Sequence, residues 1–265
     1  MSYLEDFKSE KWDGLSYSDR LSALQRAENA QAIKQGREPR KVKGVEMETG
    51  VSGHYNMAYP EYIQVNRDMV NASGEGRQNY SLLSTVYHEG RHAYQDDAIK
   101  GKIQNPKETP DTVQSWKKNY PNLGGVYYDG ETKGTYQDYR YQPIEADAND
   151  YAAKEMASHK EACSSDPGYK KYEANTAFWD GVNSDIATQD YGPQYKDAIR
   201  QKMDKEYSQK HGIGKTETVS NKKQSEKAVG SAQSRASGGQ KVSKFKQGYK
   251  PATSHAKTQS KSNKR

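Results

Sequence analysis

The sequence predicts an α+β fold, mainly helical with a short sheet, followed by a disordered basic tail. Apolar residues recur at helical spacing in several long segments. Short alternating runs broken by glycine and proline occupy residues 41–70. Large apolar residues almost disappear after about Lys215. We therefore expect three parts: a helical segment (1–40) packed on a central domain (41–212), and the tail (213–265).

The first expected element is an amphipathic helix within residues 1–40. Ser18 stands near its start, and Gly36 to Pro39 form a helix-breaking segment at its end. The apolar residues expected on one side of this helix are Leu21, Leu24, Ala27 and Ile33.

Short strands are expected next, in residues 41–70. Ile63 and Val65 alternate with polar neighbours, as in a half-buried strand. The residues that break this region into short pieces are Gly44, Gly50, Gly53 and Pro60.

Residues 78–212 are expected to be mainly helical. One helix runs from about Ser81 to Gly101, and another begins at Pro143 and continues to about His159. Between them lies a loop-rich insert, from about Gly101 to Tyr141, for which we expect a cleft wall or a short strand pair. A last helix begins near Pro193 and ends before Gly212; its apolar face comprises Tyr195, Ile199, Met203 and Tyr207.

The helix expected after Ser81 contains the run His-Glu-Gly-Arg-His, residues 88 to 92. His88 and His92 are four positions apart, so on a helix they lie on one face and can share one metal ion. Glu89 lies on the neighbouring flank, where a carboxylate can act as base toward a water at that ion. This motif indicates a zinc site.

A catalytic zinc needs a third protein ligand, and the segment Gln-Pro-Ile-Glu-Ala-Asp-Ala-Asn, residues 142 to 149, offers one. Glu145 falls in the first turn of the helix that begins at Pro143. An acidic residue there can equally serve only to offset the helix dipole. We favour Glu145 as the ligand because it follows a His-Glu-x-x-His helix.

The two strings HEGRHAYQ and QPIEADANDYA resemble the gluzincin branch of the zincin metallopeptidases, and more narrowly the minimal zincin-like domains of bacterial polymorphic toxins and mobile elements. The resemblance covers about residues 60–160. It implies that His88, His92 and Glu145 bind zinc and that Glu89 is the general base in hydrolysis of a protein or peptide substrate. In zincins an edge strand before the helix aligns the substrate, and the segment YIQVNRDMV, residues 62 to 70, fits that place.

The sequence also departs from larger gluzincins. These often carry an aspartate four residues after the ligand glutamate, as a partner for a zinc-bound histidine, whereas this chain has Asn149. Asp147 and Asp150 are nearby substitutes, but neither has the same helical phase. The oxyanion-stabilising residue stays open, with Tyr139, Tyr141 and His159 near in sequence.

Composition bounds the remaining possibilities. Only 32% of residues are hydrophobic and the mean hydropathy is −1.22, so part of the chain is expected to stay unfolded. The single cysteine, Cys163, excludes an internal disulfide. No signal-peptide or membrane-spanning segment is visible, which makes the cytoplasm the default location and leaves signal-independent secretion open. The sequence does not determine the oligomeric state.

The tail suggests two alternative functions. Residues 215–265 contain thirteen Lys or Arg and two Glu, a net charge of +11. Since the whole chain carries +6, residues 1–214 carry −5. Such a tail can bind nucleic acid or an acidic surface weakly, as in an accessory protein of a mobile element, or act only as a solubilising extension. The other alternative is a zincin-like binding module without catalysis.

Overall fold

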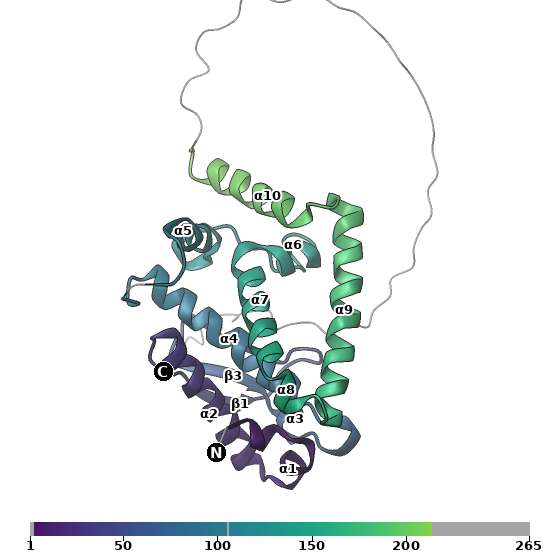
Figure 1. Cartoon of the computed structure of the whole chain (residues 1–265). Coiled ribbons are helices and arrows are strands. Elements are labelled where there is room, and N and C mark those ends of the chain that lie inside the picture. The colour runs from purple at the N-terminus through teal and green to yellow at the C-terminus, as the bar shows by residue number, and fades with distance from the viewer. Residues whose placement is uncertain (1–2, 105, 214–265) are drawn as a thin grey trace, which may run out of the picture.

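The computed structural model describes residues 3–104 and 106–213, and it confirms the predicted α+β class (Figure 1). Most of the described chain is helical, and its one sheet has three strands. The predicted tail lies, from residue 214 onward, outside the described residues. In the described part of the chain, no helix combines the length and apolar character needed to cross a membrane.

The sheet contains β1 (Lys41–Val45), β2 (Gly53–Tyr55) and β3 (Tyr62–Asn66) in the order β1-β3-β2. β1 pairs with β3 in parallel and β2 pairs with it antiparallel. The strand predicted from Ile63 and Val65 is therefore present, and both residues are fully buried. The expectation that it is an edge strand is wrong: β3 is central, and β2 forms the edge beside the motif helix.

The motif helix, α4 (Asn79–Ile99), lies at the centre of the molecule (Figure 1). It packs against α2 (Tyr17–Gln35) on one side, against α7 (Pro143–Ser158) on another, and against the sheet. Leu82, Leu83 and Val86 of this helix are fully buried in the main core. Because α4 is surrounded in this way, its side chains are held in place by several elements at once.

The N-terminal region consists of a short 3₁₀ helix (Tyr3–Phe7), α1 (Ser9–Gly14) and α2. Ser16, rather than Ser18, caps α2 by accepting a hydrogen bond from the Asp19 backbone, and Gly36 ends the helix in the left-handed conformation. The expectation for Ile33 is wrong, since it is 79% exposed. Its position on α2 turns it away from α4, whereas Leu24 and Ala27 are fully buried.

The insert after α4 contains a helix rather than a strand pair. α5 (Pro110–Asn119) starts at a Thr109 cap with Pro110 in its first turn, and a 3₁₀ turn (Pro121–Leu123) follows. α6 (Tyr136–Tyr141) then leads directly into α7. The strand-pair alternative is therefore wrong, since Pro110 and Pro121 begin helical segments and not strand connections. The cleft-wall alternative is met in part, because Tyr136 and Arg140 of the insert line a cavity beside α4.

The remaining helices are α3 (Arg67–Asn71), a 3₁₀ turn (Gly74–Gly76), α8 (Lys160–Cys163), α9 (Pro167–Tyr191) and α10 (Tyr195–Lys210). The long α9 runs along one side of the molecule, and α10 turns back across its end (Figure 1). Ile199 and Met203, predicted to form the apolar face of the last helix, are fully buried.

Gly90, inside the motif, allows α2 and α4 to approach closely. A Cβ added there would lie 2.8 Å from Arg37 Nη2 and 2.9 Å from Glu28 Oε2. These two side chains form a salt bridge of 2.6 Å from which solvent is excluded. A methyl group at position 90 would have to displace this buried pair, which is costly because it is held on both sides.

We expect Gly90→Ala to lower the free energy of unfolding by about 1–3 kcal/mol, the usual cost of overpacking. Chemical denaturation of the full chain measures it. The matched control is Gly181→Ala in α9, where nothing lies within 4 Å of the added Cβ. There the better helix propensity of alanine should raise stability by about 0.5–1 kcal/mol. Equal effects at the two positions would contradict the packing argument.

Candidate metal centre

The two motif histidines come from successive turns of α4. His88 is buried and His92 nearly so, and their Nε2 atoms lie 3.1 Å apart. The imidazole rings meet edge to face, with centroids separated by 4.7 Å. The helix therefore directs both Nε2 atoms to a single point, as the spacing predicted.

Glu145 reaches the same point from the first turn of α7. Its Oε2 lies 3.4 Å from His88 Nε2 and 3.5 Å from His92 Nε2. Among the described residues, these three side chains form the one group of His, Cys, Asp or Glu whose ligand atoms lie within 4.8 Å of one another. The set of two imidazoles and one carboxylate is a known donor set for catalytic zinc, which keeps a further position open.

The hydrogen bonding of Glu145 tests whether these residues fit a metal. The Tyr127 hydroxyl donates to Oε1 at 2.8 Å. Oε2 is buried and has no hydrogen-bond partner within the described part of the chain. A buried carboxylate oxygen without a partner is costly. A residue that only offset the helix dipole would be expected to face solvent, so the orphaned oxygen favours a ligand role for Glu145 over capping.

The hydrogen bonds of His92 also favour a metal ion at this point. The Nε2 atom of Gln95 donates to the Ile144 carbonyl at 2.9 Å and to Asp147 Oδ2 at 2.7 Å. Its Oε1 atom is therefore the one that faces His92 Nδ1, at 2.8 Å. His92 Nδ1 must therefore carry the proton and donate it to Gln95. In the neutral imidazole the lone pair is then on Nε2, the atom that faces Glu145, which is the tautomer that a metal requires.

Asp147 and Asn149, the two residues considered as partners of a zinc-bound histidine, have different hydrogen-bond partners. Asp147 reaches His92 only through Gln95, and it also accepts a hydrogen bond of 2.7 Å from Arg91 Nε. The Asn149 side chain donates to the Arg140 carbonyl at 3.5 Å.

We expect Gln95→Met to weaken metal binding by about 10- to 100-fold, because the substitution removes the partner of His92 Nδ1 while keeping a side chain of similar length. Competition with a chelator measures the affinity. Gln31→Met is the matched control, since Gln31 is a buried glutamine that bonds Glu155 and Tyr151 away from the centre. If both variants bind metal as tightly as the unmodified chain, the relay through Gln95 has no effect on the centre.

Glu89 is anchored by the edge strand. Its Oε2 accepts a hydrogen bond of 2.7 Å from the Tyr55 backbone N–H in β2, and the residue is buried. The Tyr55 hydroxyl in turn donates to Asp96 Oδ2 at 3.0 Å, one turn beyond His92 on α4. The strand and the helix together hold the Glu89 carboxylate in one orientation.

Charge in the cluster favours a cation. Burial raises the pKa of Glu145, but the neighbouring His92 and His88 outweigh it and hold that pKa below its ordinary value. Burial lowers the pKa of His92, but Glu145 and, more weakly, Glu89 raise it to about 9. The two carboxylates therefore favour positive charge at the imidazoles, which a divalent metal ion would also supply.

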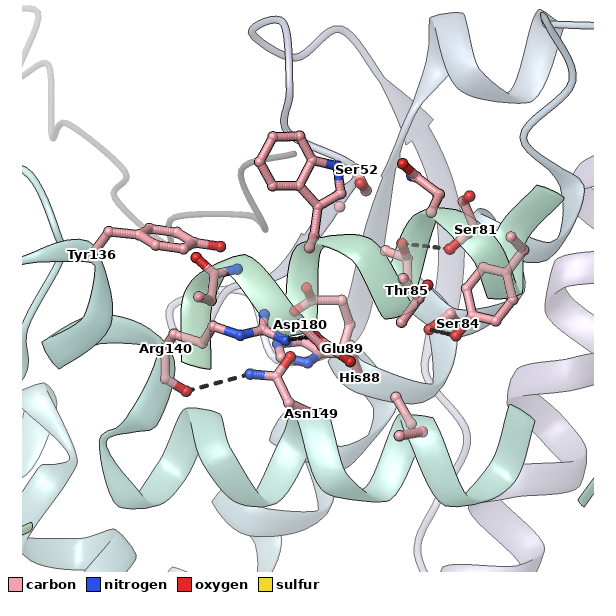
Figure 2. A pocket seen from close by; sticks show the side chains of 18 residues that line it. Ser52, Ser81, Ser84, Thr85, His88, Glu89, Tyr136, Arg140, Asn149 and Asp180 are labelled. Atoms are coloured by element: carbon pink, nitrogen blue, oxygen red, sulfur yellow. Dashed lines mark hydrogen bonds and ion pairs between the residues drawn. The ribbon is translucent and has the colours of Figure 1, made fainter. Parts of the chain in front are cut away.

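A cavity of about 110 Å³ opens beside the centre (Figure 2). It lies between α4, β2, α6, α7 and α9. His88 and Glu89 line it, together with hydroxyl and amide side chains that include Ser52, Ser84, Thr85 and Asn149.

Sequence reasoning missed Tyr127, Gln95 and Tyr55. Gln95 stands three positions after His92 on the same helix, so helical spacing could have found it. Tyr127 and Tyr55 are distant in sequence from the motif and carried no signal.

Three residues were left open as the oxyanion-stabilising group. Tyr139 is buried, and burial raises its pKa well above the ordinary value. Tyr141 packs against Tyr195, and His159 Nε2 is hydrogen-bonded to the Tyr87 hydroxyl.

Comparison of the chain with protein-family models, with curated proteins and with solved structures yields no match. The function must therefore be argued from the residues of the centre.

Proposed function

We propose that the chain is a zinc-dependent metallopeptidase in which His88, His92 and Glu145 hold the metal and Glu89 is the general base. The observation that carries the proposal is Glu145 Oε2. It is buried, has no hydrogen-bond partner among the described residues, and lies 3.4 and 3.5 Å from two histidine nitrogens. Zinc binding would give this oxygen a partner and would use both nitrogens as ligands.

Zinc held by these residues would supply Lewis acidity, polarising a scissile carbonyl and lowering the pKa of a water molecule. Glu89 moves the proton. Its Oε2 is engaged by the Tyr55 N–H, so Oε1 is the oxygen that takes the proton from the attacking water and later delivers it to the leaving amine. The Tyr55 contact prevents the carboxylate from rotating away between the two transfers.

Peptide bonds as the substrate follow from the resemblance of the two motif strings to zincins. The alternative of a binding module uses the same metal ligands but does not need Glu89. Metal analysis of the purified chain, coupled to a proteolysis assay of the Glu89→Gln variant, separates the two. The alternative that relies on the basic tail concerns residues outside the described part of the chain.

A further inference from the structure

One strongly basic side chain lines the cavity beside the metal centre. Apart from Arg140, Glu89, His88 and Asp180, the described residues that line it are uncharged, and Arg140 is the one arginine or lysine among them (Figure 2). A guanidinium in a small, mostly neutral cavity is a strong determinant of what can bind there, because it favours anions and planar oxyanions above all.

Arg140 is incompletely paired. Its Nη2 donates to Asp180 Oδ1 of α9, while its Nε is buried without a hydrogen-bond partner in the described part of the chain. Nε and Nη2 form the edge of a guanidinium that binds a carboxylate through two parallel hydrogen bonds. Asp180 therefore occupies only half of this edge. The Arg140 side chain is 16% exposed and that of Asp180 is 50% exposed, so the aspartate is the partner that solvent or a ligand can displace.

The position of Arg140 is tied to the metal centre. It lies on α6, which leads through Gln142 and Pro143 into the turn that carries Glu145. Asn149, one turn after Glu145, donates to the Arg140 carbonyl. The backbone of Arg140 is thus held by the same helix that presents the third ligand, and its side chain enters the cavity that Glu89 lines.

We propose that Arg140 recognises a carboxylate of the substrate, which displaces Asp180 and engages Nε and Nη2 together. This proposal rests on the proposed peptidase function and names its substrate class: peptides with a carboxylate next to the scissile bond. That carboxylate is either the free C-terminus or an Asp or Glu side chain. The cavity of about 110 Å³ is well below the ~300–1,000 Å³ of ordinary ligand clefts, so it suits a chain end or a single side chain.

Binding of small probes tests the proposal without turnover. The probes are N-acetyl-alanine, which carries a carboxylate, and its neutral amide, titrated into the Glu89→Gln chain by calorimetry, with zinc content measured on the same sample. The acid should bind about tenfold or more tightly than the amide, as expected for a hydrogen-bonded charge pair. Adding Arg140→Gln should remove this preference. Adding Asp180→Asn should strengthen acid binding, because it removes the competing carboxylate.

Two controls keep the test decisive. A carboxylate bound only by zinc would keep its preference in the Arg140→Gln variant, and that result overturns the proposal. Arg26→Gln and Asp6→Asn change a similar pair on the surface and should change neither probe's affinity. If Arg140→Gln does not fold, Asp180→Asn still decides: unchanged or weaker acid binding counts against Arg140 as the receptor.

The proposal and the peptidase function can fail separately. Zinc binding and Glu89-dependent hydrolysis without any Arg140-dependent preference would remove the proposal and leave the function. If the chain binds no zinc but still prefers the acid through Arg140, the peptidase function is removed and carboxylate recognition by Arg140 remains. Where hydrolysis is observed, four peptides identify the source of the recognised carboxylate. They end in either a free carboxylate or an amide, and each end is combined with Glu or Gln beside the cleaved bond. Equal rates for all four would contradict carboxylate recognition.

Discussion

Replacing Glu89 by glutamine should lower the rate of peptide hydrolysis by about 100-fold or more while zinc stays bound. Glutamine keeps the size of the side chain, and its amide can still accept the hydrogen bond from the Tyr55 N–H through its oxygen. It cannot take a proton from water at neutral pH, and loss of a general base typically costs 10²–10⁴ in rate, as an order of magnitude. Initial rates on a peptide library and zinc content per chain are the measurements.

The control for this variant is Glu155→Gln on α7. Glu155 is also buried and hydrogen-bonded, but its partners are Gln31 and Lys34, away from the cavity. This variant should hydrolyse peptides at close to the unmodified rate. If Glu89→Gln is as active as Glu155→Gln, or if both equal the unmodified chain in the biological readout, the centre serves binding rather than catalysis.

Replacing Glu145 by alanine should remove most of the bound zinc. The change leaves only two protein ligands, His88 and His92, and loss even of a residue that merely contacts a ligand typically weakens metal binding about 10- to 100-fold. Loss of a ligand should exceed that range. Zinc content after dialysis and affinity by chelator competition give the result, and His88→Ala and His92→Ala should behave alike.

The comparison variant is Asp147→Asn, which keeps side-chain size and changes only a partner of Gln95 and Arg91. It should weaken zinc binding much less than Glu145→Ala does. If the zinc affinity of Glu145→Ala stays within about twofold of that of the unmodified chain, the loss is smaller than that from even an indirect contact. The third ligand is then misassigned. A larger loss for Asp147→Asn would then identify Asp147 as the ligand.

Several features could be read from local sequence alone. The four-residue spacing of His88 and His92 determines that their rings share one helix face, since helical geometry is set by the backbone. Pro143 marks the first turn of α7, and this places Glu145 at the start of that helix. The alternation around Ile63 indicates a strand. Each of these signals spans only a few residues, and neighbouring residues in a regular element have nearly fixed relative positions.

Other features depend on which elements meet, and local patterns do not encode that. β3 is central because β1 and β2 pair on its two sides, and Ile33 is exposed because no element among the described residues covers its side of α2. The partners of the centre, Tyr127 and Tyr55, come from segments with no motif of their own.

By itself, therefore, the sequence determined the α+β class, the motif helix and the three candidate ligands. Only the tertiary structure decided that Glu145 lies against both histidines, that Glu89 is held by β2, and that Arg140 pairs with Asp180 at the cavity. The physical reason is that periodicity specifies the direction of a side chain within its own element. Contacts between distant elements are set by the packing of the whole core, to which many residues contribute weakly.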